Sequence, residues 1–118
     1  MPEVLIPAEL KGKKGVKEII MLANSGSDYT ILPTSIANEI GPKKLGRKIE
    51  LKVGGGGIVK GELCLIEIKV RDPESKEERS EEVEAIILKG QDEPLAGIST
   101  LEKLGILLDM KNGKFKFV

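Results

Sequence analysis

Short apolar runs and apolar–polar alternations dominate the chain and predict β-strands separated by turns. Residues 19–23 are apolar without interruption, which is typical of a central strand buried on both faces. Alternating positions in 49–53 and 58–70 predict strands with one buried face. Further strands are predicted at 4–6, where Pro7 closes the segment, and at 29–32, 83–87, 106–108 and 115–117.

Two short helices are predicted between these strands. The first covers residues 35–40, is capped by Thr34 or Ser35, and ends at a Gly-Pro pair. The second follows Ser99, which forms a capping box with Glu102, and it also ends at a glycine. A chain of 118 residues has the ordinary length of one domain. Because strands outnumber helices, we expect this domain to be rich in β-structure.

Charge and composition restrict the classes of function. The 19 basic and 19 acidic residues cancel, and 3% of the residues are aromatic, so we expect no nucleic-acid partner. Histidine is absent, which excludes a Ser-His-Asp or Cys-His nucleophile and any zinc site with a histidine ligand. The single cysteine, Cys64, lies in an apolar segment and is predicted to be a buried thiol. We expect neither a metal nor a cofactor.

Other features concern location, source and solvation. No apolar run approaches the ~20 residues of a membrane-spanning helix, and the start lacks the regions of a signal peptide. We therefore expect a soluble, cytoplasmic protein without a membrane partner. The charged residues, 32% of the chain, are mostly Lys and Glu, a bias that favours a heat-adapted source. Segment 71–84 has seven acidic and three basic residues, which predicts a solvated loop.

Four features that bear on chemistry follow one another along the chain. An apolar strand runs into Asn24-Ser25-Gly26-Ser27-Asp28, and Ile31-Leu32-Pro33 precede the first helix. A glycine-rich hairpin comes next, and Leu95-Ala96-Gly97 then precede the second helix. In this order and spacing they resemble the retropepsin-like aspartic proteases, the single-domain family that includes the retroviral proteases. The resemblance implies a mostly β, closed acid-protease barrel over residues 1–118, with one or two short helices and a flap hairpin.

The resemblance also implies an aspartic endopeptidase that works as a homodimer on extended peptide. Such enzymes use two carboxylates, one from each subunit, which share a proton and activate water. This chain has Asn24 where the family has its catalytic aspartate. A neutral amide cannot accept a proton from water at ordinary pH, so we predict an inactive protein. Of two explanations, an engineered Asp→Asn change and a natural pseudoenzyme, we favour the first.

Further residues take their expected roles from the same resemblance. Beside Asn24, Ser25 corresponds to the family residue whose hydroxyl binds across the dimer, and Gly26 lets the loop approach substrate closely. Substrate contacts are expected from Ser27 and Asp28, and no arginine follows Gly97 to pair with that aspartate. The tip of the flap is expected at Gly54, Gly55, Gly56 and Gly57. The strand that supports the catalytic loop is expected at Leu95, Ala96 and Gly97.

The resemblance also predicts how two copies of the chain would associate. One catalytic loop in each chain is half a site, so two copies of Asn24 are expected to meet on a two-fold axis. The apolar segments 4–6 and 106–108, with Phe115 and Phe117, are the candidates for the interface. Two other hypotheses stay open: a natural, non-catalytic peptide-binding or dimerisation module with this fold, and a small β-barrel of unrelated function.

Overall fold

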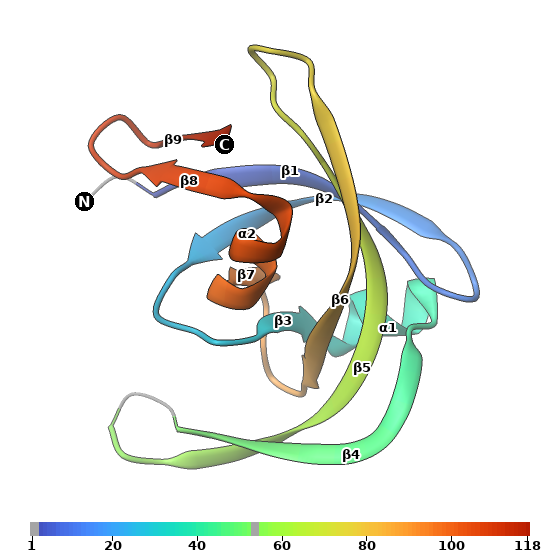
Figure 1. Cartoon of the computed structure of the whole chain (residues 1–118). Coiled ribbons are helices and arrows are strands. Elements are labelled where there is room, and N and C mark those ends of the chain that lie inside the picture. Colours follow the sequence, from blue (N-terminus) through green and yellow to red (C-terminus); the bar gives the residue numbers. More distant parts are fainter. Residues whose placement is uncertain (1–2, 53–54) are drawn as a thin grey trace.

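Nine strands and two short helices make up residues 3–52 and 55–118, which the computed structural model describes. Figure 1 shows the strands wrapping around a central core, with the helices against them. In chain order the elements are β1 (Leu5–Lys11), β2 (Val16–Asn24), β3 (Thr30–Pro33), α1 (Thr34–Ile40), β4 (Lys43–Lys52), β5 (Ile58–Arg71), β6 (Glu78–Leu88), β7 (Leu95–Gly97), α2 (Ile98–Leu104), β8 (Ile106–Asp109) and β9 (Lys114–Phe117).

Six of the strands close into a barrel. Their order is β1-β2-β7-β3-β6-β5, and the pairing of β5 with β1 completes the ring. The pairs β2–β7 and β3–β6 are parallel, and the other pairs around the ring are antiparallel. Among the described residues, strand β4 pairs with β5 alone, along residues 58–65, and β8 with β9 forms a separate hairpin. The expected mostly β, closed barrel with two short helices is confirmed.

The core follows the predicted alternation. Ile66, Ile68 and Val70 of β5 are each at most 2% exposed and pack with buried residues of β1, β6 and both helices. Cys64 is fully buried in the same strand, as predicted. Burial, reinforced by the charge of Glu62, raises the pKa of its thiol to about 11. The thiol is therefore a core group with little nucleophilic character.

Three expectations about the strands are wrong in their extent. Strand β1 continues through Pro7, since a barrel strand tolerates proline where its nitrogen needs no hydrogen bond. Strand β2 is not buried on both faces, because Ile20 points outward and is 62% exposed. The acidic segment 71–84 is mostly strand: β5 extends to Arg71, and β6 begins at Glu78. Four of its seven acidic residues lie on β6, where the ribbon leaves them exposed or half-buried without a loop.

The helix positions are confirmed, but their predicted caps are not. Helix α1 begins after Pro33 and α2 after Gly97, and neither has a side-chain hydrogen bond at its cap. Thr34 and Ser99 lie inside the helices, and the Ser99 hydroxyl binds a carbonyl elsewhere in the fold. Both helices end at a glycine with positive φ, 63° at Gly41 and 68° at Gly105, as predicted. In the part of the chain that is described, no helix has the length and apolar character to cross a membrane.

Asp72 organises the tight turn between β5 and β6. Its Oδ1 accepts a hydrogen bond from the Glu74 backbone N–H at 2.9 Å, and its Oδ2 accepts one from the Ser75 hydroxyl at 3.0 Å. The Glu74 hydrogen bond is the main reason why the pKa of Asp72 lies below its ordinary value. The ionised carboxylate therefore contributes to the stability of the fold.

This contribution has a defined pH dependence. Since the folded state lowers the pKa of Asp72, its contribution is present above the ordinary pKa of about 4 and is lost as the pH falls through the lowered value. Asp72→Asn should therefore melt below the wild type near neutral pH, and the gap in melting temperature should narrow as the pH is lowered from about 7 to below about 4. Thermal melts across this range measure it, with the exposed Asp92→Asn as control. A gap that stays constant with pH would contradict the assignment.

Candidate functional site

The loop that follows β2 forms the first part of the candidate site. Asn24 is the last residue of the strand, and its Oδ1 accepts a hydrogen bond from the Gly26 backbone N–H at 3.1 Å. The Ser27 N–H donates to the Asn24 carbonyl at 3.2 Å, which closes the turn. Asn24 is half-buried, whereas Ser25 and Gly26 are exposed at the tip. The turn thus holds the Asn24 side chain at the point where the strand leaves the barrel.

Strand β7 runs beside this loop. It pairs with β2 in parallel register, so that Gly97 lies opposite Asn24 and Ala96 opposite Ala23. A methyl group on Gly97 would collide with the Tyr29 carbonyl and lie 2.9 Å from the Ser27 carbonyl oxygen. Only glycine allows the loop and the strand to approach this closely. The expected position of Leu95, Ala96 and Gly97 beside the loop is thus observed.

Two buried threonines tie the loop to α2. The Thr30 hydroxyl donates to Thr100 Oγ1 at 2.7 Å and accepts from the Gly97 N–H at 3.2 Å. Both threonines are at most 1% exposed. Because buried polar groups without partners are costly, this network fixes β3, β7 and α2 relative to one another. Nothing in the spacing of Thr30 and Thr100, which are 70 residues apart, indicated this contact beforehand.

A second set of hydrogen bonds joins the loop to the start of α2. The Ile98 N–H donates to the Ser27 carbonyl at 2.7 Å, and the Ser99 hydroxyl donates to the Asp28 carbonyl at 2.6 Å. The Ser27 hydroxyl turns inward to the Tyr29 carbonyl at 2.8 Å. The Asp28 carboxylate is exposed and forms no ion pair with any residue that the structure describes. It is available to a ligand.

A cleft of about 440 Å³ separates this loop from β4. The loop contributes Asn24, Gly26, Ser27, Asp28 and Tyr29 to its wall. Residues of β4 form another part of the lining, and the remainder comes from β3, β7, the end of β6 and the segment after it. In Figure 1 the hairpin of β4 and β5 extends past the barrel on the side of the β2–β3 loop. We call this hairpin the flap ribbon.

The lining of the cleft combines apolar and polar side chains. Its apolar lining consists of Tyr29, Ile31, Ile49, Leu51, Leu88 and Leu95. The side chains that carry charge or amide groups are those of Asn24, Asp28, Glu50, Lys52 and Gln91. This combination suits an extended peptide, whose main chain needs hydrogen bonds and whose apolar side chains need pockets.

The other expected site residues lie around the cleft or outside it. Ser25 lies at the loop tip, Gly55 to Gly57 are exposed at the end of the flap ribbon, and neither group lines the cleft. Gly55 and Gly56 have φ of 88° and 84°, which the hairpin tip requires of glycine. Gly54 falls outside the described residues. Ala96 and Gly97 are buried behind the loop and support it without reaching the cleft.

Sequence reasoning missed several residues of the cleft. Tyr29 and Ile31 line it, but their apolar character only predicted a strand. The same holds for Ile49 and Leu51, whose alternation predicted a buried face without saying what that face would meet. Gln91 follows β6 in a segment without any recognisable pattern. The alternation of Ile49 and Leu51 beside a flap was the one available signal.

The fold of this chain is similar to that of a known protein. No family model matches the sequence, and no curated protein is significantly similar to it. Among solved structures, the EIAV protease in complex with the inhibitor HBY-793 is similar in fold, with a TM-score of 0.55. The match covers 92% of this chain and 91% of that chain at 17% sequence identity. The chain has the retropepsin-like fold.

The Thr30 network is open to a direct test. Thr30→Val removes one hydroxyl and leaves the Gly97 N–H and the Thr100 hydroxyl without their buried partner. We expect the free energy of unfolding to fall by about 1–3 kcal/mol. The exposed Thr34→Val is the matched control, with a change within about 0.5 kcal/mol. Urea denaturation measures both, and equal effects would show that the buried network does not hold the loop.

Proposed function

We propose that this chain is the scaffold of an aspartic endopeptidase of the retroviral-protease type. In this proposal Asn24 stands at the catalytic position, and the chain binds extended peptide but does not hydrolyse it. The observation that carries the proposal is the cleft, in which the Asn24 loop faces the flap ribbon within a retropepsin-like fold. The similarity to the EIAV protease supports the fold, and the residues of the loop support the chemistry.

The proposed chemistry needs two carboxylates at one axis. When two such groups lie close together, they cannot both ionise readily, so the pair holds one proton. The ionised carboxylate removes a proton from water, and the resulting oxygen nucleophile attacks the scissile carbonyl carbon. The protonated carboxyl donates a hydrogen bond to the carbonyl oxygen as charge develops there. With Asn24 in both subunits, no group at the axis accepts the proton of water.

The Asn24 contacts are compatible with an Asp→Asn exchange. The side-chain oxygen Oδ1 accepts from the Gly26 N–H at 3.1 Å, and a carboxylate oxygen would accept the same hydrogen bond. The turn therefore imposes no requirement for an amide. We propose that aspartate is the native residue and that the change was made to inactivate the enzyme. The identity of residue 24 in the native gene decides this point.

The proposed active unit is a homodimer, since one loop supplies half of the dyad. The predicted interface segments contain both buried and exposed apolar side chains. Val4 and Ile6 are 1% exposed in the core of their own chain, whereas Leu5 is 52% and Leu107 is 50% exposed. Phe115 and Phe117 are half-buried against the core. Leu5 and Leu107 are thus the apolar side chains of these segments that a second copy could cover.

Asn24→Asp tests the proposed activity. The variant should cleave unfolded polypeptide, best in acid, where the dyad holds one proton. We expect a rate at least about 100-fold above that of the present chain, because general acid–base catalysis contributes at least this factor. Mass spectrometry of the products of a reduced, alkylated protein substrate measures the rate and the cleavage sites.

Asn38→Asp is the matched control, since it adds the same charge at an exposed position of α1 outside the cleft. It should stay inactive. Absence of cleavage by Asn24→Asp from about pH 2 to about pH 7, with the dimer intact, would contradict the proposed enzyme. If that inert variant still bound extended peptide, the chain would instead be a non-catalytic peptide-binding module.

Leu107→Glu tests the dimer. A charge placed at a covered interface would lose its solvation, so this variant should be monomeric at concentrations where the wild type is a dimer. Ile20→Glu is the matched control, because Ile20 is 62% exposed on β2, outside the proposed interface segments. Analytical ultracentrifugation distinguishes the species. A monomeric wild type would contradict the dimer and favour a barrel of unrelated function.

The cytoplasmic location and the heat-adapted source stay predictions from composition. The same is true of the absence of a nucleic-acid or membrane partner. These points do not enter the argument for the proposed chemistry, which depends only on the loop, the cleft and the fold.

A further inference from the structure

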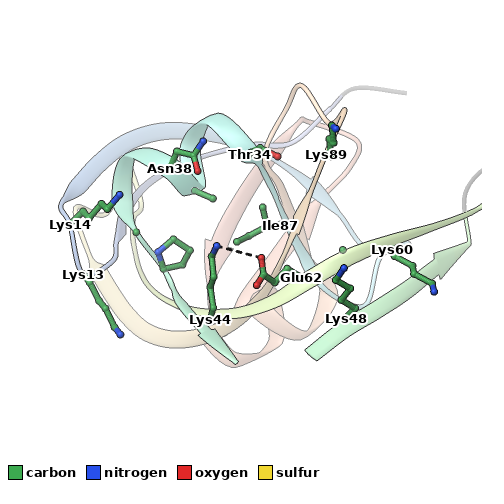
Figure 2. Close-up of a pocket in the computed structure, with 14 residues that line it drawn as sticks. Lys13, Lys14, Thr34, Asn38, Lys44, Lys48, Lys60, Glu62, Ile87 and Lys89 are labelled. Carbon is green, nitrogen blue, oxygen red and sulfur yellow. Dashed lines mark ion pairs between the residues drawn. The ribbon is translucent and has the colours of Figure 1, made fainter. Parts of the chain in front are cut away.

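A second pocket, outside the cleft, has six lysines among its 14 lining residues (Figure 2). Its volume is about 540 Å³, and its lining includes six lysines and a single glutamate. The lysines are Lys13, Lys14, Lys44, Lys48, Lys60 and Lys89. The whole chain has a net charge of zero, so this lining concentrates positive charge on one part of the molecule. We call it the lysine pocket.

The lysine pocket and the cleft are lined by different residues of the flap ribbon. Ile49 and Leu51 of β4 line the cleft, whereas Lys48 lines the lysine pocket. On β5, Lys60 and Glu62 line the lysine pocket and do not line the cleft. Glu50 and Lys52 of β4 also line the cleft, and no described residue of the ribbon lines both sites. A ligand of the lysine pocket therefore does not occupy the peptide cleft.

An irregularity in β4 brings two of the lysines together. Lys44 is opposite Cys64 and Lys48 is opposite Glu62, so four residues of β4 span two residues of β5. In a regular strand Lys44 and Lys48 would be about 14 Å apart, but their partners on β5 are separated by only about 7 Å. Gly46, with φ of 72°, lies within this bulge. The bulge thus concentrates like charges, at a cost in repulsion.

Backbone contacts position the lysines of the β1–β2 turn. The Lys13 N–H donates to the Gly41 carbonyl at 2.7 Å, and the Lys14 N–H donates to the Ile40 carbonyl at 2.9 Å. The side chain of Lys14 also packs over Gly41, where an added Cβ would lie 2.7 Å from its Cγ. Figure 2 shows Lys14, Lys44 and Lys48 directed toward the pocket, with Lys13 and Lys60 pointing outward. Part of the charged lining is therefore held in place before any ligand binds.

Most of this positive charge is not compensated within the protein. Two lysines form ion pairs: Lys44 Nζ lies 3.6 Å from Glu62 Oε1, and Lys60 Nζ lies 3.8 Å from Glu50 Oε1. Within residues 3–52 and 55–118, the other four lysines form no ion pair. The base of the pocket contains the buried residues Ala37, Pro42 and Gly61. An anion that enters would meet ammonium groups on several sides and relieve their mutual repulsion.

From this arrangement we propose that the lysine pocket binds a small anion that carries several phosphate groups. Its volume is in the range of small-ligand sites, and its excess positive charge matches the several negative charges of a polyphosphate. Lysine acts as a point charge toward phosphate, and the lining contains no arginine, the residue that binds carboxylates in bidentate fashion. It also contains no aromatic residue on which a nucleic-acid base could stack.

Calorimetry with inorganic tripolyphosphate tests the proposal, with the Lys14→Gln/Lys48→Gln double variant as the key comparison. The wild type should bind one equivalent per chain at low ionic strength and lose affinity as salt is added. The double variant should bind at least about tenfold more weakly, because it loses two charge-assisted contacts. Both lysines are exposed, so the variant should keep the fold, which circular dichroism verifies.

Lys111→Gln/Lys116→Gln is the matched control, since it removes the same charge from exposed positions near the C-terminal hairpin. Its affinity should stay within about twofold of the wild type. An equal loss in both double variants, or several equivalents bound per chain, would show unspecific attraction and overturn the proposal. It would also be overturned if tripolyphosphate did not bind, or if hexaglutamate bound more tightly. All these experiments measure the affinity or stoichiometry of anion binding, so their outcomes are independent of peptidase activity.

Discussion

The candidate site depends on one close approach of the backbone, that of Gly97 to the loop after β2. The parallel pairing of β7 with β2 brings Gly97 opposite Asn24, and there is no space for a side chain at position 97. The buried Thr30 hydroxyl then binds both the Gly97 N–H and Thr100. Through these contacts, the loop and the first turn of α2 form one rigid unit. Ile49 and Leu51 of the flap ribbon pack against the same buried cluster as Leu95, and this apolar packing holds the ribbon opposite the loop.

Local patterns were sufficient to predict most of the elements. The alternation of apolar and polar residues predicted β5 and β6. Gly41 and Gly105 predicted the ends of both helices, and the structure gives both a positive φ. The Asn24 loop and β7 were expected together, and they are neighbours in the barrel. The predicted capping box of the second helix does not form, because Ser99 has a different partner. The Ser99 hydroxyl binds the Asp28 carbonyl, a contact across 71 residues that satisfies the serine outside its own helix.

The rest could not be predicted because it arises from positions that are distant along the chain. The Thr30–Thr100 hydrogen bond joins segments without any shared pattern. The lysines of the second pocket are spread between residues 13 and 89, and the chain is neutral as a whole. Composition therefore gave no sign that positive charge would gather in one place. The β4 bulge and the contact between the β1–β2 turn and α1 create that arrangement only in the folded state.

The flap ribbon connects the two sites physically. Ile49 and Leu51 of the ribbon line the cleft, while Lys48 and Lys60 of the same ribbon line the lysine pocket. An anion that contacted both Lys14 and Lys48 would bridge the β1–β2 turn to the ribbon, because these residues belong to different elements of the fold. Such a bridge would restrict the ribbon relative to the turn, and a peptide in the cleft would meet the restricted ribbon. By thermodynamic linkage, any effect of the anion on peptide affinity would be matched by an equal effect of peptide on anion affinity.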